Sequence, residues 1–205
     1  MKTATSVIIG LGLTLAALGA AAGTQMSGGR KSSAEFTEKG ELVRPRDYRT
    51  WVFIGAPLTP NDMNDGHAAF PEFHNVYLDP GSYEHYKDTG NFRDGAVIVK
   101  ELVSVGSKTA PSGKGYFEGE YLGVEAMVKS KEHFPKEPGQ WGFFRFTDEE
   151  AAAQGKLGSL KKVATVNRAA ACASCHTAGD QDYVFTQHYP VLRAAKNAKE
   201  NPENK

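Results

Sequence analysis

Cysteine is scarce in this chain of 205 residues, which contains only Cys172 and Cys175. Two cysteines are too few for the disulfide framework that holds many small secreted domains together. An excess of one charge is also lacking, since 24 Lys and Arg residues face 24 Asp and Glu residues. This balance argues against a nucleic-acid partner, for which a basic surface is the usual requirement. The length allows one domain with a sizeable core.

Long hydrophobic runs are confined to the N-terminus, where residues 7–18 (VIIGLGLTLAAL) follow the positive charge of Lys2. An apolar run of this length, preceded by a basic residue and followed by small residues, is typical of a secretory signal peptide. The alternative is an uncleaved membrane anchor, but the run is short beside the ~20 residues of a spanning helix. We expect a bacterial signal peptide over residues 1–22, its removal, and a periplasmic mature protein without a membrane segment.

The rest of the chain is expected to consist of a polar, flexible arm over residues 23–40 and one domain over residues 41–199. Most of the domain has a strand-like composition, interrupted by turns that contain Gly and Pro. The predicted strands are Trp51–Ile54, Glu72–Leu78, Ala96–Val105, Gly115–Val128 and Trp141–Thr147.

Helices are predicted in three places. Asp79 is a suitable N-cap for a helix that begins at Pro80, and Gly90 is a suitable C-terminal cap. Residues 167–176 and 182–199 contain few turn residues and favour short helices. The sequence therefore predicts a single α+β domain, dominated by an antiparallel β-sheet, with short helices and a helical C-terminal segment.

The two cysteines belong to the segment Cys172-Ala173-Ser174-Cys175-His176, which has the C-x-x-C-H pattern of c-type haem attachment. Two thiols one helical turn apart can each add to a haem vinyl group, and the histidine that follows can bind the iron. A thioredoxin-like redox pair would normally follow a strand in a βαβ unit, which is not predicted here. A zinc site would need further ligands, and the chain has no second cysteine pair.

Whether such a haem transfers electrons or binds small molecules depends on the ligand on the opposite side of the iron. A simple electron-transfer cytochrome would need a sixth protein ligand. No methionine and no histidine other than His176 stands out as that ligand, which favours an open site. His74 and His188 cannot be assigned a place from the sequence.

Two charged residues lie on apolar faces of predicted strands. With a period of two, Lys100 shares a face with Ile98 and Leu102, so it lies at a sheet edge or is held inward for a purpose. By the same period, Glu125 shares a face with the residues Phe117, Tyr121 and Met127.

A carboxyl group in apolar surroundings has a raised pKa and can accept protons near neutral pH. Taken alone, each of these two residues is more often structural than functional. Glu101 and Glu120 lie on the opposite strand faces and are expected to be solvated.

Over residues 36–193, the chain resembles the cytochrome P-460 family. The resemblance rests on an ordered series of segments that includes the C-x-x-C-H motif. These segments are residues 48–66 (YRTWVFIGAPLTPNDMNDG), 70–95 (FPEFHNVYLDPGSYEHYKDTGNFRDG), 96–106 (AVIVKELVSVG), 115–135 (GYFEGEYLGVEAMVKSKEHFP), 172–176 (CASCH) and 182–193 (DYVFTQHYPVLR).

The resemblance implies a periplasmic homodimer with a largely β-sheet fold and one c-type haem per chain. It implies that Cys172 and Cys175 attach the haem, that His176 binds the iron, and that Lys100 forms an additional covalent bond to the macrocycle. It further implies that the enzyme oxidises hydroxylamine to nitrous oxide and passes electrons to an external acceptor, such as a soluble periplasmic cytochrome c. Glu125 matches the family's distal base.

Two other functions remain open at this point. A cytochrome of the related c′-beta type shares the haem attachment, binds nitric oxide in an aromatic pocket and lacks the lysine bond. A plain electron-transfer cytochrome c is the second alternative. Lys100 and Glu125 together favour the hydroxylamine-oxidising enzyme.

Overall fold

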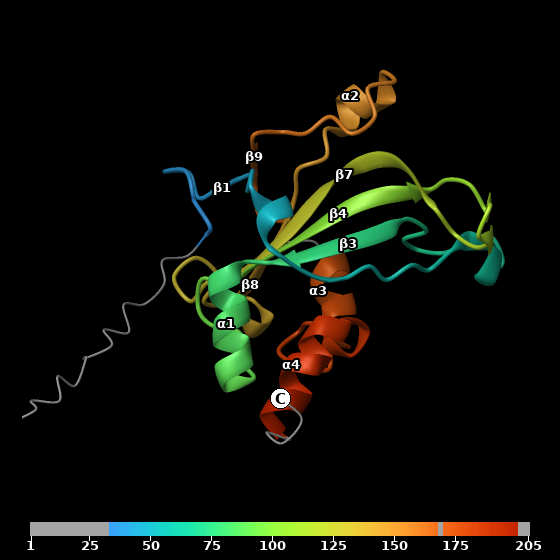
Figure 1. Ribbon diagram of the computed structural model, residues 1–205. Helices are drawn as coiled ribbons and strands as arrows, with labels where there is room; N and C mark the ends of the chain where they lie inside the picture. Colours follow the sequence, from blue (N-terminus) through green and yellow to red (C-terminus); the bar gives the residue numbers. More distant parts are fainter. Residues whose placement is uncertain (1–32, 168–169, 201–205) are drawn as a thin grey trace, which may run out of the picture.

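The computed structural model describes residues 33–167 and 170–200 (Figure 1). The predicted signal peptide and the first part of the predicted arm lie outside these ranges. In the last part of that arm, Phe36 forms a β-bridge with Leu42 and stacks on the ring of His133. The packed part of the domain therefore includes residues before 41. No helix within the described ranges has the length and apolar character that crossing a bilayer requires.

A five-stranded antiparallel sheet forms the centre of the domain, in the order β2-β3-β4-β7-β8. Its strands are β2 (Val52–Gly55), β3 (Phe73–Leu78), β4 (Val97–Val105), β7 (Glu118–Lys129) and β8 (Trp141–Arg145). All five predicted strands are thus present. The short strands β1 (Leu42–Val43) and β9 (Val163–Ala164) pair with each other, as do β5 (Thr109–Ala110) and β6 (Gly113–Lys114).

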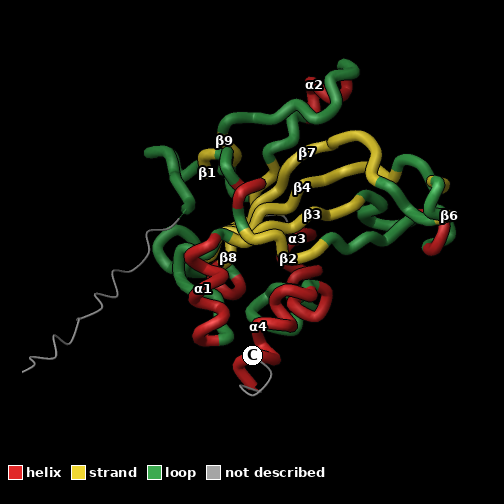
Figure 2. Tube along the Cα trace, in the orientation of Figure 1, coloured by secondary structure: helices red, strands yellow, loops and turns green. Residues whose placement is uncertain are grey.

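Helices α1 (Pro80–Thr89), α3 (Ala170–His176) and α4 (Pro190–Glu200) lie on one side of the sheet, and the β1–β9 pair lies on the other (Figures 1 and 2). The short helix α2 (Glu149–Ala153) projects from the β8–β9 connection. The structure confirms the α+β prediction and the predicted ends of α1. The Asp79 carboxylate accepts from the backbone N–H of Ser82, and Gly90 ends the helix with a left-handed φ of 75°.

Alternate residues of the central strands supply two separate hydrophobic clusters. Ile98 packs toward the helices with Met127 and Leu192, whereas Val99 packs toward β1 and β9 with Val124. Because β4 is covered on both faces, every residue in its middle meets other side chains. Lys100 and Leu102 follow Ile98 on the face that looks toward the helices.

The pairing of β4 with β7 is irregular between Leu102 and Val103, where the register moves from Gly123 to Tyr121. This bulge places Tyr121 on the opposite face, against the cluster that contains Val124. The prediction that Tyr121 shares a face with Glu125 is therefore wrong. A strict period of two cannot reveal an inserted residue.

Glu101 is buried, with 7% of its surface exposed, so the prediction that it is solvated is wrong. Its carboxylate accepts from the Tyr48 hydroxyl at 3.1 Å and from the Arg49 guanidinium at 2.7 and 3.0 Å. The cause is the second layer of structure on that face of the sheet, which the strand pattern alone did not indicate. Glu120 is exposed, as predicted.

The C-terminal segment is less helical than predicted. Helix α4 begins at Pro190, and the residues before it form a tight turn and the 3₁₀ turn η4 (Thr186–His188). Asp182 and Tyr183 have φ values of 49° and 64°, which an α-helix does not accommodate.

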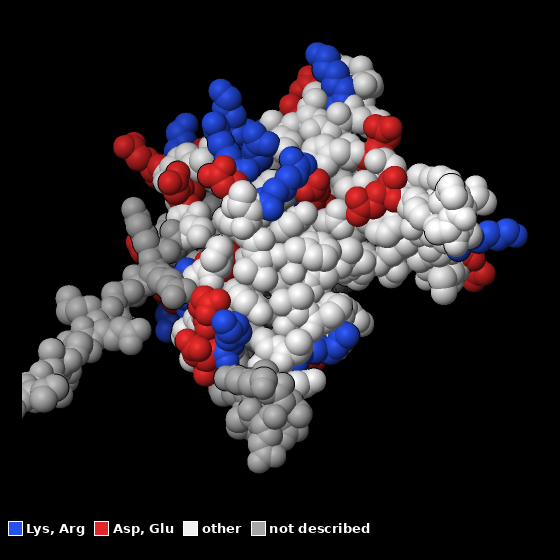
Figure 3. Space-filling view, viewed as in Figure 1, with Lys and Arg blue, Asp and Glu red and all other residues white. Residues whose placement is uncertain are grey.

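Charges of both signs alternate around the rim of the face shown in Figure 3, while the band across the middle is largely uncharged. This distribution agrees with the balanced composition.

Candidate functional site

Lys100 and Glu125 lie directly opposite each other in the register of β4 and β7. Their side chains form an ion pair, with 2.7 Å between Lys100 Nζ and Glu125 Oε2. Both are mostly buried, with exposed side-chain fractions of 26% and 18%. The two residues that were unusual in the sequence are therefore neighbours, held in place by two central strands.

Arg145 is the second partner of Glu125 and lies opposite it in the register of β7 and β8. Its guanidinium donates to Glu125 Oε1 through Nε and Nη2, each at 2.9 Å. Arg145 was not predicted from the sequence, although its position carries the same signal as that of Lys100. With a period of two, Arg145 shares a strand face with the apolar residues Trp141 and Phe143.

The two cations determine the acidity of the carboxyl group between them. Burial raises the pKa of Glu125, but the charges and hydrogen bonds of Lys100 and Arg145 outweigh burial and hold that pKa below its ordinary value. The expectation of a raised pKa is therefore wrong for a chain in which Lys100 is charged. The alternation of residues along one strand does not reveal the cross-strand neighbours that lower the pKa of Glu125.

Helix α3 carries the C-x-x-C-H motif and lies on the same side of the sheet as this ion pair (Figure 1). Both cysteines are free; Cys172 is half-buried and Cys175 is exposed. Burial is the main cause that raises the pKa of the Cys172 thiol, and the negative charge of Glu125 adds to it.

His176 is held by its Nδ1 atom, which lies 2.8 Å from the backbone carbonyl oxygen of Tyr183. A carbonyl can only accept, so Nδ1 carries the proton and Nε2 keeps its lone pair. The rings of Phe143 and Phe185 pack against the imidazole, with centroid distances of 4.7 and 5.1 Å. Burial lowers the pKa of His176 and so favours its neutral form, in which Nε2 can bind a metal ion.

An aromatic ring and a second histidine border the Lys100 side chain. The Phe70 ring centre lies 5.1 Å from Lys100 Nζ and 6.0 Å from the His74 ring. His74 lies opposite Leu102 in the register, so it is on the Lys100 face, and its Nε2 is 3.5 Å from the Glu72 carboxylate. His188 is exposed and stacks on Phe185.

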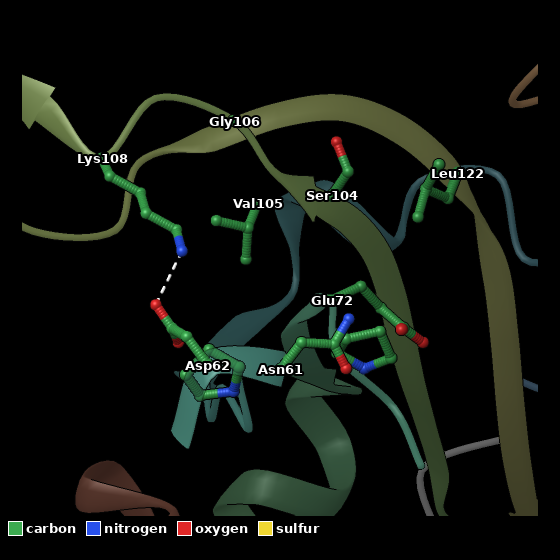
Figure 4. Close-up of a pocket in the computed structure, with 10 residues that line it drawn as sticks. Asn61, Asp62, Glu72, Ser104, Val105, Gly106, Lys108 and Leu122 are labelled. Atoms are coloured by element: carbon green, nitrogen blue, oxygen red, sulfur yellow. Dashed lines mark hydrogen bonds and ion pairs between the residues drawn. The ribbon is translucent and has the colours of Figure 1, made fainter. Parts of the chain in front are cut away.

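A pocket of about 290 Å³ lies beside this site, between the segment that precedes β3 and the turn that joins β4 to β7 (Figure 4). Lys108 and Asp62 form an ion pair of 2.6 Å at one side of it, and Glu72 lines another. None of the residues expected to bind or act in catalysis lines this pocket. It is a neighbour of the candidate site and shares only Glu72 with the group around His74.

The family model for cytochrome P460 matches residues 45–186. The chain belongs to the cytochrome P460 family. This membership identifies a haem-binding cytochrome with oxidoreductase chemistry, and it confirms the resemblance inferred from the sequence. The matched range contains Lys100, Glu125, Cys172, Cys175 and His176. No curated protein matches the chain.

The side chains of the site are suited to the haem that the family binds. His176 offers Nε2 as an iron ligand because its other nitrogen is already engaged, an arrangement common among metal-binding histidines. Two free thiols lie within one turn of the same helix. Charged and aromatic side chains border the sheet face on that side.

Proposed function

We propose that this protein is a periplasmic c-type haem enzyme that oxidises hydroxylamine to nitrous oxide. The observation that carries the proposal is the ion pair of Lys100 and Glu125 on the side of the sheet where His176 lies. A lysine for macrocycle attachment and a carboxylate for proton transfer are the two features that distinguish this activity from simple electron transfer. Lys100 and Glu125 are residues of these two types, and they are in contact.

Cys172 and Cys175 would attach the haem through thioethers, and His176 Nε2 would bind its iron. The haem would supply the redox chemistry, with the electrons of hydroxylamine leaving to an external acceptor that we propose is a soluble cytochrome c. The protein side chains position the substrate and move its protons. The enzyme is proposed to act as a homodimer with one haem per chain.

Lys100 is the residue that would hold the macrocycle through an additional bond at Nζ. With Nζ engaged in this way, it would no longer pair with Glu125 Oε2. Arg145 still holds Oε1 by two hydrogen bonds and keeps the carboxylate in its orientation. Without the Lys100 charge beside it, the pKa of Glu125 would rise, and Glu125 would become the better acceptor for the protons that hydroxylamine releases.

The test is an assay of the purified mature protein with hydroxylamine and an artificial electron acceptor. The proposal predicts acceptor reduction together with nitrous oxide, measured by gas chromatography. His176→Ala should abolish both, because the iron loses its protein ligand. A haem-loaded protein that binds nitric oxide but consumes no hydroxylamine would contradict the proposal and favour the c′-beta alternative. A six-coordinate spectrum with no response to either ligand would favour the electron-transfer cytochrome.

The remaining parts of the proposal have their own tests. Export is tested by fractionating cells that express the full chain and sequencing the mature N-terminus, which should begin near residue 23. Sedimentation of the holoprotein tests the homodimer. Stopped-flow reduction of a soluble cytochrome c by the hydroxylamine-treated enzyme tests the acceptor.

A further inference from the structure

The backbone carbonyl of Tyr183, which accepts a hydrogen bond from His176, belongs to an unusual turn. Gln181 and Val184 exchange backbone hydrogen bonds of 2.9 and 3.3 Å, and Asp182 and Tyr183 are the two residues between them. Both have left-handed φ values, of 49° and 64°. Turns of this kind normally contain Asn-Gly or Asp-Gly, because a bulky side chain is strained in this region. A tyrosine is held in this conformation only if the surrounding structure imposes it.

Lys129, the last residue of β7, restrains this turn. Its Nζ donates to both carboxylate oxygens of Asp182, at 2.8 and 2.9 Å, and to the Gly139 carbonyl at 2.7 Å. The Lys129 side chain is only 12% exposed, so these contacts are sheltered from water. The indole N–H of Trp141 donates to the Asp182 carbonyl at 2.9 Å. Asp182 is therefore held to the sheet by its side chain and by its backbone.

Gly139 completes the restraint, since a β-carbon at this position would collide with the Tyr183 ring. The ring packs closely over the glycine, and the Tyr183 carbonyl stays 2.8 Å from His176 Nδ1. A chain of contacts thus runs from the sheet to the imidazole. It passes from Lys129 to Asp182, then to the backbone of Tyr183, and from there to His176.

We propose that Lys129 and Asp182 are positioning residues that set the electron donation of His176 to the haem iron. This inference rests on the proposed role of His176 as iron ligand. A carbonyl held in line with Nδ1–H draws that proton away from the ring and makes Nε2 a stronger donor. A stronger donor strengthens the iron–nitrogen bond and stabilises the oxidised iron, so the reduction potential falls. When the turn is released, the carbonyl moves and both effects weaken.

The experiment compares five forms of the mature holoprotein. Lys129→Met removes the ammonium group but keeps the apolar stem beside Trp141. Asp182→Asn removes the negative charge while retaining a residue that tolerates a left-handed backbone. Lys129→Arg is the conservative variant, because it keeps a cation within reach of Asp182. Lys87→Met is the matched control, since it removes an exposed lysine that is paired with Glu84 on α1. Wild type completes the set.

Resonance Raman spectra of the reduced proteins report the iron–histidine stretch, and redox titrations report the potential. Lys129→Met and Asp182→Asn are expected to move the stretch to lower frequency, broaden it and raise the potential. Lys129→Arg should restore both toward wild type, and Lys87→Met should change neither. An unchanged stretch and potential in Lys129→Met and Asp182→Asn would overturn the inference. If wild type itself shows no iron–histidine band, it is the proposed function that fails, because that function requires a five-coordinate iron with His176 as its one protein ligand.

Discussion

Lys100 and Glu125 face each other across β4 and β7, and 2.7 Å separates their charged atoms. The lysine proposed to bond the haem macrocycle and the carboxylate proposed to accept protons are thus paired with each other. Together with Arg145, the pair places three charged side chains on a sheet face that otherwise carries mainly apolar ones. It also makes the acidity of Glu125 depend on what Lys100 is bound to.

In the haem-free chain, where the ion pair is intact, Lys100→Met is predicted to raise the pKa of Glu125. Burial, the largest influence, raises this pKa, and the ammonium group of Lys100 is one of the two charges that oppose it. Once methionine replaces Lys100, only Arg145 opposes the effect of burial on this pKa, so the carboxyl group holds its proton to a higher pH. Infrared spectra recorded across a pH titration measure this through the carboxylic acid band. An unchanged midpoint in Lys100→Met would show that the ion pair does not control Glu125.

Glu125→Gln is predicted to lower the rate of hydroxylamine oxidation by roughly 10²–10⁴-fold, the usual contribution of a general base. The amide has nearly the same shape as the carboxylate but cannot accept a proton, so the binding of hydroxylamine should persist. Steady-state turnover and optical titration with hydroxylamine measure the two quantities separately. Glu120→Gln, an exposed position on the same strand, is the control and should keep full activity. Full turnover in Glu125→Gln would remove Glu125 from the mechanism.

Glu101→Gln is predicted to destabilise the fold by about 1–3 kcal/mol, the usual cost of leaving buried polar groups poorly paired. The amide cannot replace both the ion pair with Arg49 and the hydrogen bond from Tyr48. Arg49 is 60% exposed, so water compensates for part of the loss. Denaturant unfolding measures the change, again with Glu120→Gln as the control. Equal stability of the two variants would mean that the Glu101 contacts contribute nothing to the fold.

Much of this architecture follows from local patterns in the sequence. Asp79, Pro80 and Gly90 define α1 because capping depends on residues close in the chain. The strands follow from alternation and turns, and the apolar faces around Lys100 and Glu125 indicated two inward charges. These features need no knowledge of distant contacts.

The features that were missed depend on contacts between distant segments. The burial of Glu101 comes from Tyr48 and Arg49, more than fifty residues earlier in the chain. The face of Tyr121 is reversed by a bulge, which composition does not mark. The turn at Asp182 exists because Lys129 and Trp141 hold it from the sheet. Sequence periodicity contains no information on any of these partners.

Peptide mapping of the mature holoprotein by mass spectrometry tests the central claim most directly. After digestion, we predict one haem-containing species that joins the peptide with Cys172 and Cys175 to the peptide with Lys100. The Lys100 peptide should be absent in its unmodified form. Lys100→Met should yield the haem on the cysteine peptide alone, which verifies the assignment. A wild-type digest in which the haem is attached only to the cysteine peptide, with Lys100 as a free amine, would contradict the account.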